Sequence, residues 1–156
     1  MKTKVLKDVA LIIYDFDGVM TDNRITLRED GVESVTVNRS DGLAVGIIKK
    51  AGLRQMIVST ETNKVVSARA KKIGIPAVQG VENKKEYVES YCHKQRIPMN
   101  RVVYVGNDLN DLAVMMIVGY PVCPADACAE VRKIAKIVLR STGGSGVVRE
   151  LLDIIK

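Results

Sequence analysis

The 156-residue chain carries a net charge of +6, with 47% hydrophobic and 27% charged residues. This length is typical of one domain, and the composition is ordinary for a globular protein. The longest apolar run is far shorter than the roughly 20 residues that a membrane-spanning helix needs. Aromatic residues make up only 4% of the chain and form no basic-aromatic cluster for base stacking. We therefore expect neither a membrane nor a nucleic acid as a partner.

The cysteines and the first residues indicate the compartment. Cys92, Cys123 and Cys128 are odd in number and lack the spacing of a metal site, so we expect free thiols in a reducing environment. The opening stretch, MKTKVLKDVALIIYD, is basic, but its apolar part is short and no small-residue cleavage site follows it. We interpret this stretch as the lead-in to a strand and expect a cytoplasmic protein.

Short apolar runs alternate with amphipathic stretches along the whole chain. This alternation predicts a mostly parallel sheet covered by helices on both faces, in a single α/β domain over residues 1–156 with a three-layer, Rossmann-like architecture. In chain order, the predicted elements are a strand at 9–15, a hairpin at 25–37, a helix at 41–51, a strand at 54–59, helices at 62–73 and 83–95, a strand at 101–106, a helix at 109–117, a strand at 119–123 and a helix at 146–155.

The predicted hairpin, ITLREDGVESVTV, consists of two β-rich runs around the turn signal Asp-Gly. Ile25, Leu27, Val35 and Val37 alternate with polar residues and give it one apolar face. A two-stranded hairpin is marginally stable in water, and its unpaired edges favour association. Because one subunit offers little material to cover this face, we expect the hairpins of several subunits to pack together.

The carboxyl ends of the predicted strands carry the candidate site residues, and in a parallel sheet these ends meet at one edge. Two aspartates one residue apart, such as Asp15 and Asp17, repel each other unless a cation lies nearby. Carboxylate and amide oxygens are suitable ligands for Mg²⁺. We predict a Mg²⁺ site formed by Asp15, Asp17, Asn107 and Asp108. Ser59, at the end of the second strand, and Lys84, at the start of a helix, should lie beside this site.

These residue types suit phosphoryl transfer. Asp15 is the candidate nucleophile that forms an aspartyl-phosphate, and Asp17 is the candidate acid and base. Ser59 offers a hydroxyl group and Lys84 a positive charge to the phosphoryl oxygens. This division of roles needs no histidine, and the only one, His93, lies inside a predicted amphipathic helix.

The ordered set DFDGVMTD, Ser59, Lys84 and GNDLND resembles the haloacid dehalogenase-like (HAD) phosphatases. The resemblance implies a HAD-like fold and Mg²⁺-dependent hydrolysis of a phosphate monoester. Within GNDLND, we expect Asn110 and Asp111 to support the metal loop rather than to bind the metal directly.

No cap domain is present in the sequence, because the hairpin insertion at about 24–38 is all that the first gap between motifs holds. This compact form, with RSDGLAVGIIKKAG and GGSGVVREL, looks like the phosphatases of 3-deoxy-octulosonate (KDO) 8-phosphate and of nonulosonate 9-phosphates, and also like the C-terminal domain of CMP-sialic acid synthetases. The resemblance implies a homotetramer in which neighbouring subunits help close each active site.

Two departures bear on function. The usual Gly-Asp-Asp of these phosphatases is Gly106-Asn107-Asp108 here, which removes one charge and admits the alternative of a weakly active or non-catalytic assembly domain related to acylneuraminate cytidylyltransferase. After Ser59 the octulosonate enzymes continue with Gly-Arg, whereas this chain has Thr60-Glu61. Glu61 resembles the nonulosonate branch, and this favours a sialic acid-type 9-phosphate as substrate, with KDO 8-phosphate as the alternative.

Five residues are candidates for binding the sugar acid: Glu61, Arg69, Lys72, Asp41 and Arg149. Glu61 would accept hydrogen bonds from sugar hydroxyls, and Arg69 or Lys72 would meet the substrate carboxylate. Glu61 is equally a favourable acid in a first helical turn, and Lys72 a solvated helix residue. Asp41 matches a family acid but also suits a helix cap, and Arg149 after the glycines would lie near a neighbour's site or simply in the last helix.

Overall fold

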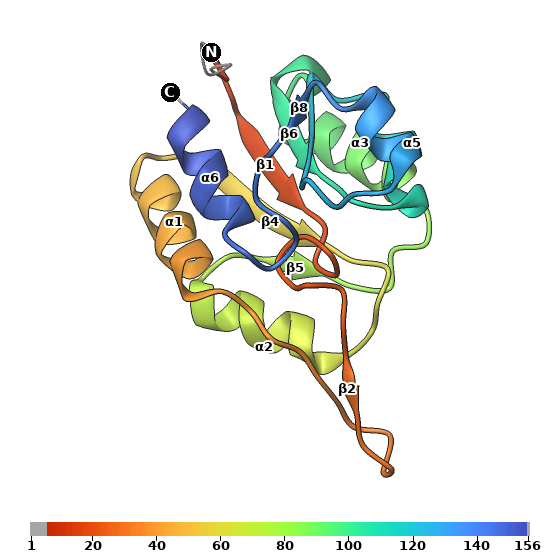
Figure 1. The fold of residues 1–156 in the computed structure, drawn as a ribbon. Helices are drawn as coiled ribbons and strands as arrows, with labels where there is room; N and C mark the ends of the chain where they lie inside the picture. Colours follow the sequence, from red (N-terminus) through yellow and green to blue (C-terminus); the bar gives the residue numbers. More distant parts are fainter. Residues whose placement is uncertain (1–5, 156) are drawn as a thin grey trace.

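The first apolar run of the sequence forms a central strand of a six-stranded parallel sheet (Figure 1). The structure is a computed structural model that describes residues 6–155. Strand β1 (Leu11–Tyr14) is buried at every residue and lies between β4 (Arg54–Val58) and β6 (Val102–Val105). The order across the sheet is β5-β4-β1-β6-β7-β8, with β5 at Ala77–Val78, β7 at Tyr120–Cys123 and β8 at Ile137–Val138. The predicted α/β class is confirmed.

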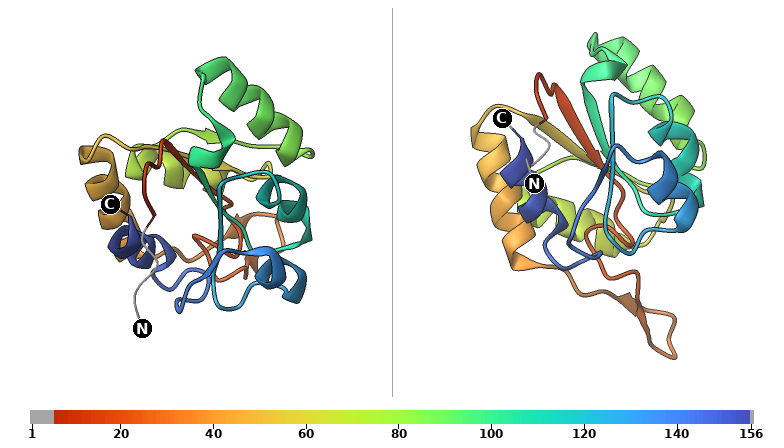
Figure 2. Two further views of the ribbon diagram at one scale, coloured as in Figure 1. Left: turned by 90° about the horizontal axis from the view of Figure 1, so that it is seen from above. Right: turned by 45° about the horizontal axis from the view of Figure 1, so that its top comes forward.

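Helices cover both faces of the sheet, as the views in Figure 2 show. Successive side chains of β1 point to opposite faces, so Ile12 and Tyr14 join one apolar cluster while Leu11 and Ile13 join the other. The first cluster includes residues of α1 (Arg39–Lys50), α2 (Lys64–Ile73) and α6 (Val147–Ile154), and the second includes residues of α3 (Lys84–Gln95), α4 (Leu112–Met115) and α5 (Ala129–Ile134). Within residues 6–155, no helix is long and apolar enough to cross a membrane.

The structure differs from the prediction where the observed helices and strands are short. The predicted helix at 109–117 is a 3₁₀ turn, η2 (Leu109–Asp111), followed by the single turn of α4. A second 3₁₀ turn, η1 (Met99–Arg101), precedes β6. Helix α5 has six residues and β8 has two, which is too few for a hydrophobic period to show, and neither was predicted.

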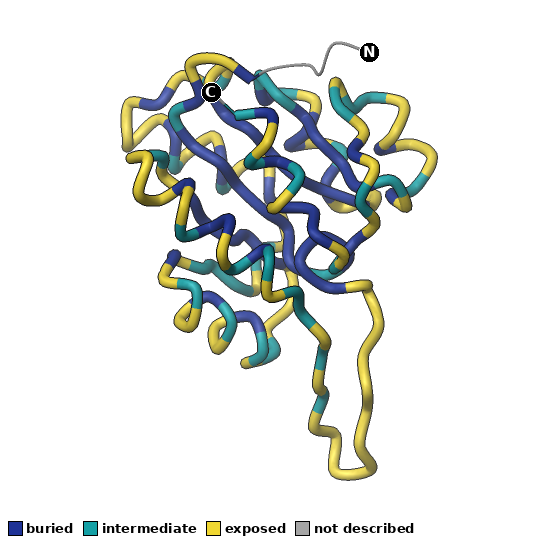
Figure 3. Tube along the Cα trace, turned by 60° about the vertical axis from the view of Figure 1, so that its left-hand side comes forward, coloured by how far each residue is buried: buried dark blue, intermediate teal, exposed yellow. Residues whose placement is uncertain are grey.

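The hairpin is present but only partly regular. Strands β2 (Thr26–Leu27) and β3 (Glu33–Ser34) pair antiparallel, and the hairpin projects from the body of the molecule beyond α2 (Figures 1 and 3). Ile25 and Leu27 are 50% and 63% exposed, whereas Val35 and Val37 are half-buried and pack against the main core. The predicted single apolar face is therefore divided, and the arm that carries Ile25 and Leu27 is the exposed part.

The glycine-rich segment 142–146 supports the loop that follows β1. A Cβ atom on Gly143 would lie 2.3 Å from the carbonyl oxygen of Gly18, so only glycine allows this approach. The N–H of Gly144 donates to the carbonyl oxygen of Val19 at 3.0 Å, and the N–H of Gly143 donates to Asp126 Oδ1 at 2.9 Å. These contacts fix the backbone beneath the two aspartates that end the first apolar run.

Candidate active site

The ends of three adjacent strands meet at one small cavity. Tyr14 of β1 is level with Ile57 of β4 and Val105 of β6, so the residues that follow these strands lie side by side. The cavity has a volume of about 100 Å³, which suits a phosphoryl group, whereas pockets that enclose whole ligands usually measure several hundred Å³. It is lined by Asp15, Asp17, Asn23, Ser59, Thr60, Glu61, Asn107, Asp108 and Asn110.

A buried lysine holds the carboxylate of Asp15. Lys84 is only 2% exposed, and its Nζ lies 3.0 Å from Asp15 Oδ1 and 2.8 Å from Asp111 Oδ1. Asp15 Oδ1 also accepts a hydrogen bond from the backbone N–H of Phe16 at 2.7 Å. One cation therefore separates and neutralises two buried carboxylates that would otherwise repel each other.

Asp111 connects this lysine to the loop after β6. Its Oδ1 accepts hydrogen bonds from Lys84 and from the hydroxyl of Tyr104 at 2.7 Å, while its Oδ2 accepts from the N–H groups of Asn107 at 2.9 Å and Asp108 at 3.3 Å. The supporting role expected for Asp111 matches these contacts. The contribution of Tyr104 was not predicted, because a tyrosine within an apolar strand gives no sign of where its hydroxyl group points.

The pKa values of this group follow from burial and charge. The pKa of Asp15 is raised to about 7; burial is the main cause, the nearby charge of Asp111 adds to it, and the ammonium group of Lys84 opposes both. Burial by itself would lower the pKa of Lys84, but Asp15 and Asp111 keep the pKa above its ordinary value. The lysine is therefore charged at neutral pH.

Asp17 also has a raised pKa, as a proton donor requires. Burial is the main cause, and the negative charges of Glu61 and Glu33 add to it. Glu33 belongs to the hairpin, so the insertion reaches the electrostatic surroundings of the cavity.

The amide group of Asn107 lies beside the oxygen atoms that follow β1. One of its terminal atoms is 3.2 Å from Asp15 Oδ2 and 2.9 Å from the carbonyl oxygen of Asp17; as the NH₂ group this atom donates to both, and in the opposite rotamer the amide oxygen joins them. Gly18, at φ 81°, makes room, because a Cβ atom there would lie 2.0 Å from this amide. Carboxylate, carbonyl and amide oxygens together form a donor set that fits a hard cation such as Mg²⁺.

Asp108 is placed differently from the other three predicted metal ligands. Its side chain is exposed at the rim and accepts a hydrogen bond from the N–H of Leu109 at 2.8 Å, which caps η2. The structure thus brings Asp15, Asn107 and the carbonyl group of Asp17 together. Of the two neighbouring residues, Asn107 rather than Asp108 lies beside Asp15.

Ser59 and the loop after it form the other wall of the cavity. Ser59 is 1% exposed, and its Oγ accepts a hydrogen bond from the N–H of Glu61 at 3.1 Å, so its own O–H is free to donate. Thr60 and Glu61 are exposed at the rim, where Asn110 Nδ2 donates to Thr60 Oγ1 at 3.1 Å. The loops after β4 and β6 are therefore bonded to each other at the mouth of the cavity.

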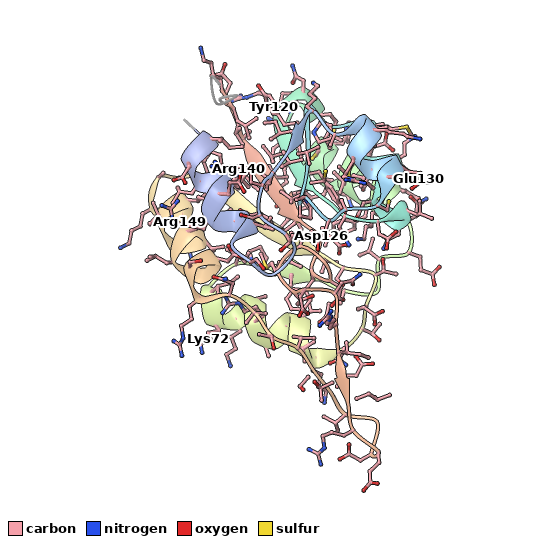
Figure 4. The ribbon with its side chains drawn as sticks, in the orientation of Figure 1. Lys72, Tyr120, Asp126, Glu130, Arg140 and Arg149 are labelled. Atoms are coloured by element: carbon pink, nitrogen blue, oxygen red, sulfur yellow. The ribbon has the colours of Figure 1, made fainter. Side chains whose placement is uncertain are left out.

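Arg69 and Lys72 lie away from this cavity. They line a separate pocket of about 440 Å³ with Val37, Arg39, Gly42 and Ile73. Arg69 Nη2 donates to the carbonyl oxygen of Asn38 at 2.8 Å, and its buried Nε has no partner within residues 6–155. Lys72 is exposed on α2 (Figure 4). Neither residue lines the cavity that holds Asp15.

Asp41 and Arg149 are also outside the cavity. Asn38, not Asp41, caps α1 by accepting from the N–H of Ser40, so the predicted cap at Asp41 is wrong for its own helix. Asp41 is instead buried and accepts from the N–H of Arg149 at 3.0 Å, at the start of α6. The side chain of Arg149 pairs with Asp153 on the outer surface (Figure 4).

Comparison with known proteins identifies the family. Residues 53–151 match the haloacid dehalogenase-like hydrolases. The chain is 33% identical over 150 residues to the 3-deoxy-D-manno-octulosonate 8-phosphate phosphatase of Escherichia coli K12, covering 96% of this chain and 80% of that protein. The same enzyme of Salmonella typhi gives the same identity and coverage.

Solved structures agree. A protein of Streptomyces avermitilis, described as a HAD family hydrolase, superposes with a TM-score of 0.94 at 42% identity, over 97% of this chain and 87% of that one. The 3-deoxy-D-manno-octulosonate 8-phosphate phosphatase of Moraxella catarrhalis, in complex with magnesium, phosphate and KDO, gives a TM-score of 0.91 at 28% identity, over 95% and 86% of the two chains.

The chain therefore belongs to the haloacid dehalogenase-like hydrolases. Within them it falls in the family of the 3-deoxy-D-manno-octulosonate 8-phosphate phosphatases, and it is a phosphatase. The HAD-like α/β fold with a small hairpin insertion, predicted from the sequence, is confirmed.

The Lys84→Met variant tests the buried ion pairs. In metal-free buffer at pH 8, we expect a loss of about 3–5 kcal/mol in the free energy of unfolding, because Asp15 and Asp111 are left buried without a cation. The folded-state pKa of Asp15 already exceeds its unfolded value of about 3.9. The native state therefore takes up a proton as the pH falls, and the deficit should shrink between pH 8 and pH 5.

Urea unfolding at both pH values measures this effect. The exposed neighbour provides the control, since Lys85→Met should change stability by no more than about 0.5 kcal/mol. A deficit for Lys84→Met that is equally large at pH 5 and pH 8 would contradict the electrostatic explanation.

Proposed function

We propose that this protein hydrolyses the phosphate monoester of a 2-keto-3-deoxy sugar acid, through an aspartyl-phosphate and with Mg²⁺. The observation that carries the proposal is the placement of Asp15. One oxygen of its carboxylate is held by Lys84, and the other faces the oxygen cluster around Asn107, at a cavity of phosphoryl size. Bound Mg²⁺ would be held by Asp15, Asn107 and the Asp17 carbonyl group, and would offset negative charge on the phosphoryl oxygens.

In the first step, the carboxylate of Asp15 attacks phosphorus and the ester P–O bond breaks. Ser59 O–H and Lys84 Nζ face the phosphoryl oxygens and stabilise their charge as it shifts. The protonated carboxyl group of Asp17 donates its proton to the departing sugar oxygen. The products are the free sugar acid and a phosphoryl group on Asp15.

In the second step, water hydrolyses the aspartyl-phosphate. Asp17, now a carboxylate, takes a proton from the water molecule. The water oxygen attacks phosphorus at the same time, and the bond between phosphorus and Asp15 breaks. The raised pKa of Asp17 suits this alternation, since burial and the charges of Glu61 and Glu33 favour the protonated form that begins the cycle.

Two substrates are candidates. A nonulosonate 9-phosphate of the sialic acid type is supported by Glu61, which lies at the rim of the cavity where sugar hydroxyls would meet it. KDO 8-phosphate is supported by the names of the relatives. A kinetic screen of both phosphates, each with Mg²⁺ and with chelator, distinguishes them by kcat/KM.

The nucleophile is tested by Asp15→Asn. We expect phosphate release to fall on the order of 10³-fold or more, because an amide does not form the acyl-phosphate. Asp22→Asn removes an exposed carboxylate of the same sequence stretch, and it should stay within about threefold of the parent. Activity of Asp15→Asn within a few-fold of the parent would overturn the aspartyl-phosphate mechanism.

The metal site is tested by Asn107→Asp. A carboxylate in place of a neutral amide should lower the Mg²⁺ concentration for half-maximal activity by about tenfold. Asn110→Asp adds the same charge at the rim of the cavity and should shift the titration much less. If Asn107→Asp leaves the Mg²⁺ titration unchanged, the amide does not bind the metal.

We further propose a homotetramer whose subunits close one another's sites. The arm with Ile25 and Leu27 is exposed, and the pocket with Arg39, Arg69 and Lys72 is separate from the cavity of its own chain. In an assembly, these cations reach the sugar carboxylate of a neighbour's substrate. The open, shallow site thereby gains the wall that a cap domain provides elsewhere.

Leu27→Lys tests this assembly. It should dissociate the tetramer at micromolar concentration and lower kcat/KM for the sugar acid phosphate more than for an aryl phosphate. Because Val35 packs on the main core, the exposed arm is the safer place for a charge. Thr36→Lys, at an exposed polar position of the other arm, is the control. Sedimentation of the parent as a fully active monomer would refute the proposal.

A further inference from the structure

The loop at 60–63 links the catalytic cavity to the hairpin. It runs from the end of β4 to the start of α2 and carries Thr60 and Glu61, which line the cavity. At its other end, Asn63 Nδ2 donates a hydrogen bond to Glu33 Oε2 of the hairpin at 2.8 Å. The position of a sugar-facing side chain is thus connected to an element outside the sheet and its helices.

The side-chain amide and the backbone carbonyl group of Asn63 are all hydrogen-bonded. Its Oδ1 accepts from the N–H of Val65 at 3.1 Å and caps α2, and its carbonyl oxygen accepts from Gln79 Nε2 at 2.7 Å. Its Nδ2 is the group that Glu33 holds. The side chain therefore cannot turn toward or away from the hairpin without breaking the cap of its own helix.

Gln79 transmits the position of Asn63 to Glu61. Its Nε2 also donates to the carbonyl oxygen of Glu61 at 3.2 Å, and the N–H of Gly80 donates to the same oxygen at 3.2 Å. The N–H of Glu61 in turn donates to Ser59 Oγ. A displacement of Asn63 should therefore move Glu61, because Gln79 is hydrogen-bonded to the carbonyl oxygens of both residues.

The hairpin has little other packing on α2 at this level. A groove of about 470 Å³ lies between the two, with Gly31, Val32 and Glu33 on one side and residues 62–65 and Ala68 on the other. Within residues 6–155, the bond between Glu33 and Asn63 is the one hydrogen bond that joins a side chain of residues 24–34 to another element. This pair therefore bridges the groove between the hairpin and the start of α2.

We propose that Glu33 and Asn63 are positioning residues that couple the hairpin to the sugar-facing loop, so that the placement of the hairpin sets selectivity for the leaving group. The inference rests on the proposed function in one respect, namely that Glu61 faces the sugar. It assigns no chemistry to either residue. The phosphoryl group lies deeper, against Asp15 and Ser59, and the charge of Glu33 acts on its transfer only as a lesser contribution to the raised pKa of Asp17, which affects every phosphate monoester alike.

The decisive variant is Asn63→Asp. Aspartate still caps α2, so the unfolding midpoint should not fall, but the donated hydrogen bond is replaced by two like charges. We expect kcat/KM for the sugar acid phosphate to fall about tenfold, mainly through KM, while kcat/KM for an aryl phosphate stays within about twofold of the parent.

Exchanging the donor and the acceptor provides the rescue. Glu33→Gln alone keeps an oxygen for Asn63, so the ratio of kcat/KM for the sugar acid phosphate to kcat/KM for an aryl phosphate should stay within about threefold of the parent ratio. In the Asn63→Asp background, the glutamine amide at 33 donates to the new carboxylate, and selectivity should return. Glu29→Gln in the same background removes the same charge from an exposed residue of the hairpin tip, and it should restore nothing.

Hydrogen exchange provides a readout that does not depend on the substrate. In Asn63→Asp, the amides of Glu61 and Gly80 should exchange faster than in the parent, and the double variant with Glu33→Gln should reverse the change. If the parent hydrolyses neither sugar acid phosphate, the proposed function fails while exchange still decides the coupling. Unchanged exchange, equal losses on both substrates, or a change in sedimentation that accompanies the loss would each overturn the coupling.

Discussion

The ammonium group of Lys84 is the interaction on which the rest of the site depends. Two carboxylates, those of Asp15 and Asp111, are buried within 3.0 Å of it, and neither would remain ionised in such a place without a cation. The three residues come from the end of β1, the start of α3 and the turn after β6. One charge therefore fixes the relative positions of three segments that are distant in sequence.

The consequences extend outward from Asp111. Its second oxygen binds the backbone of Asn107 and Asp108, which sets the course of the loop and turns the side chain of Asn107 toward Asp15. Gly18 leaves the space that this side chain occupies. Contacts within the protein therefore hold the oxygen cluster that suits Mg²⁺ in place. The carboxylates around the cavity would offset the positive charge of a bound metal ion.

The parts of the site that follow from the order of strands and helices could be predicted from the sequence. The ends of parallel strands meet at one edge, so Asp15, Ser59 and Asn107 were expected together. Whether Asn107 or Asp108 lies beside Asp15 depends on backbone hydrogen bonds within one turn, which the order of two adjacent residues does not reveal. Asp41 was assigned to the helix that contains it, whereas it accepts a hydrogen bond from the N–H of Arg149 in the first turn of α6, 108 residues later in the sequence. Arg69 and Lys72 share a helix that the cavity does not reach, and a sequence gives no means to tell one subunit's site from its neighbour's.

The small volume of the cavity separates reaction from recognition in physical space. In the proposed reaction, the buried groups would contact only what every phosphate monoester has in common, while exposed side chains at the rim would meet the sugar. Exposed positions tolerate substitution with little cost in stability, so a change of substrate would require substitutions at the surface alone. Such a change would be recorded in residues such as Glu61 rather than in Asp15.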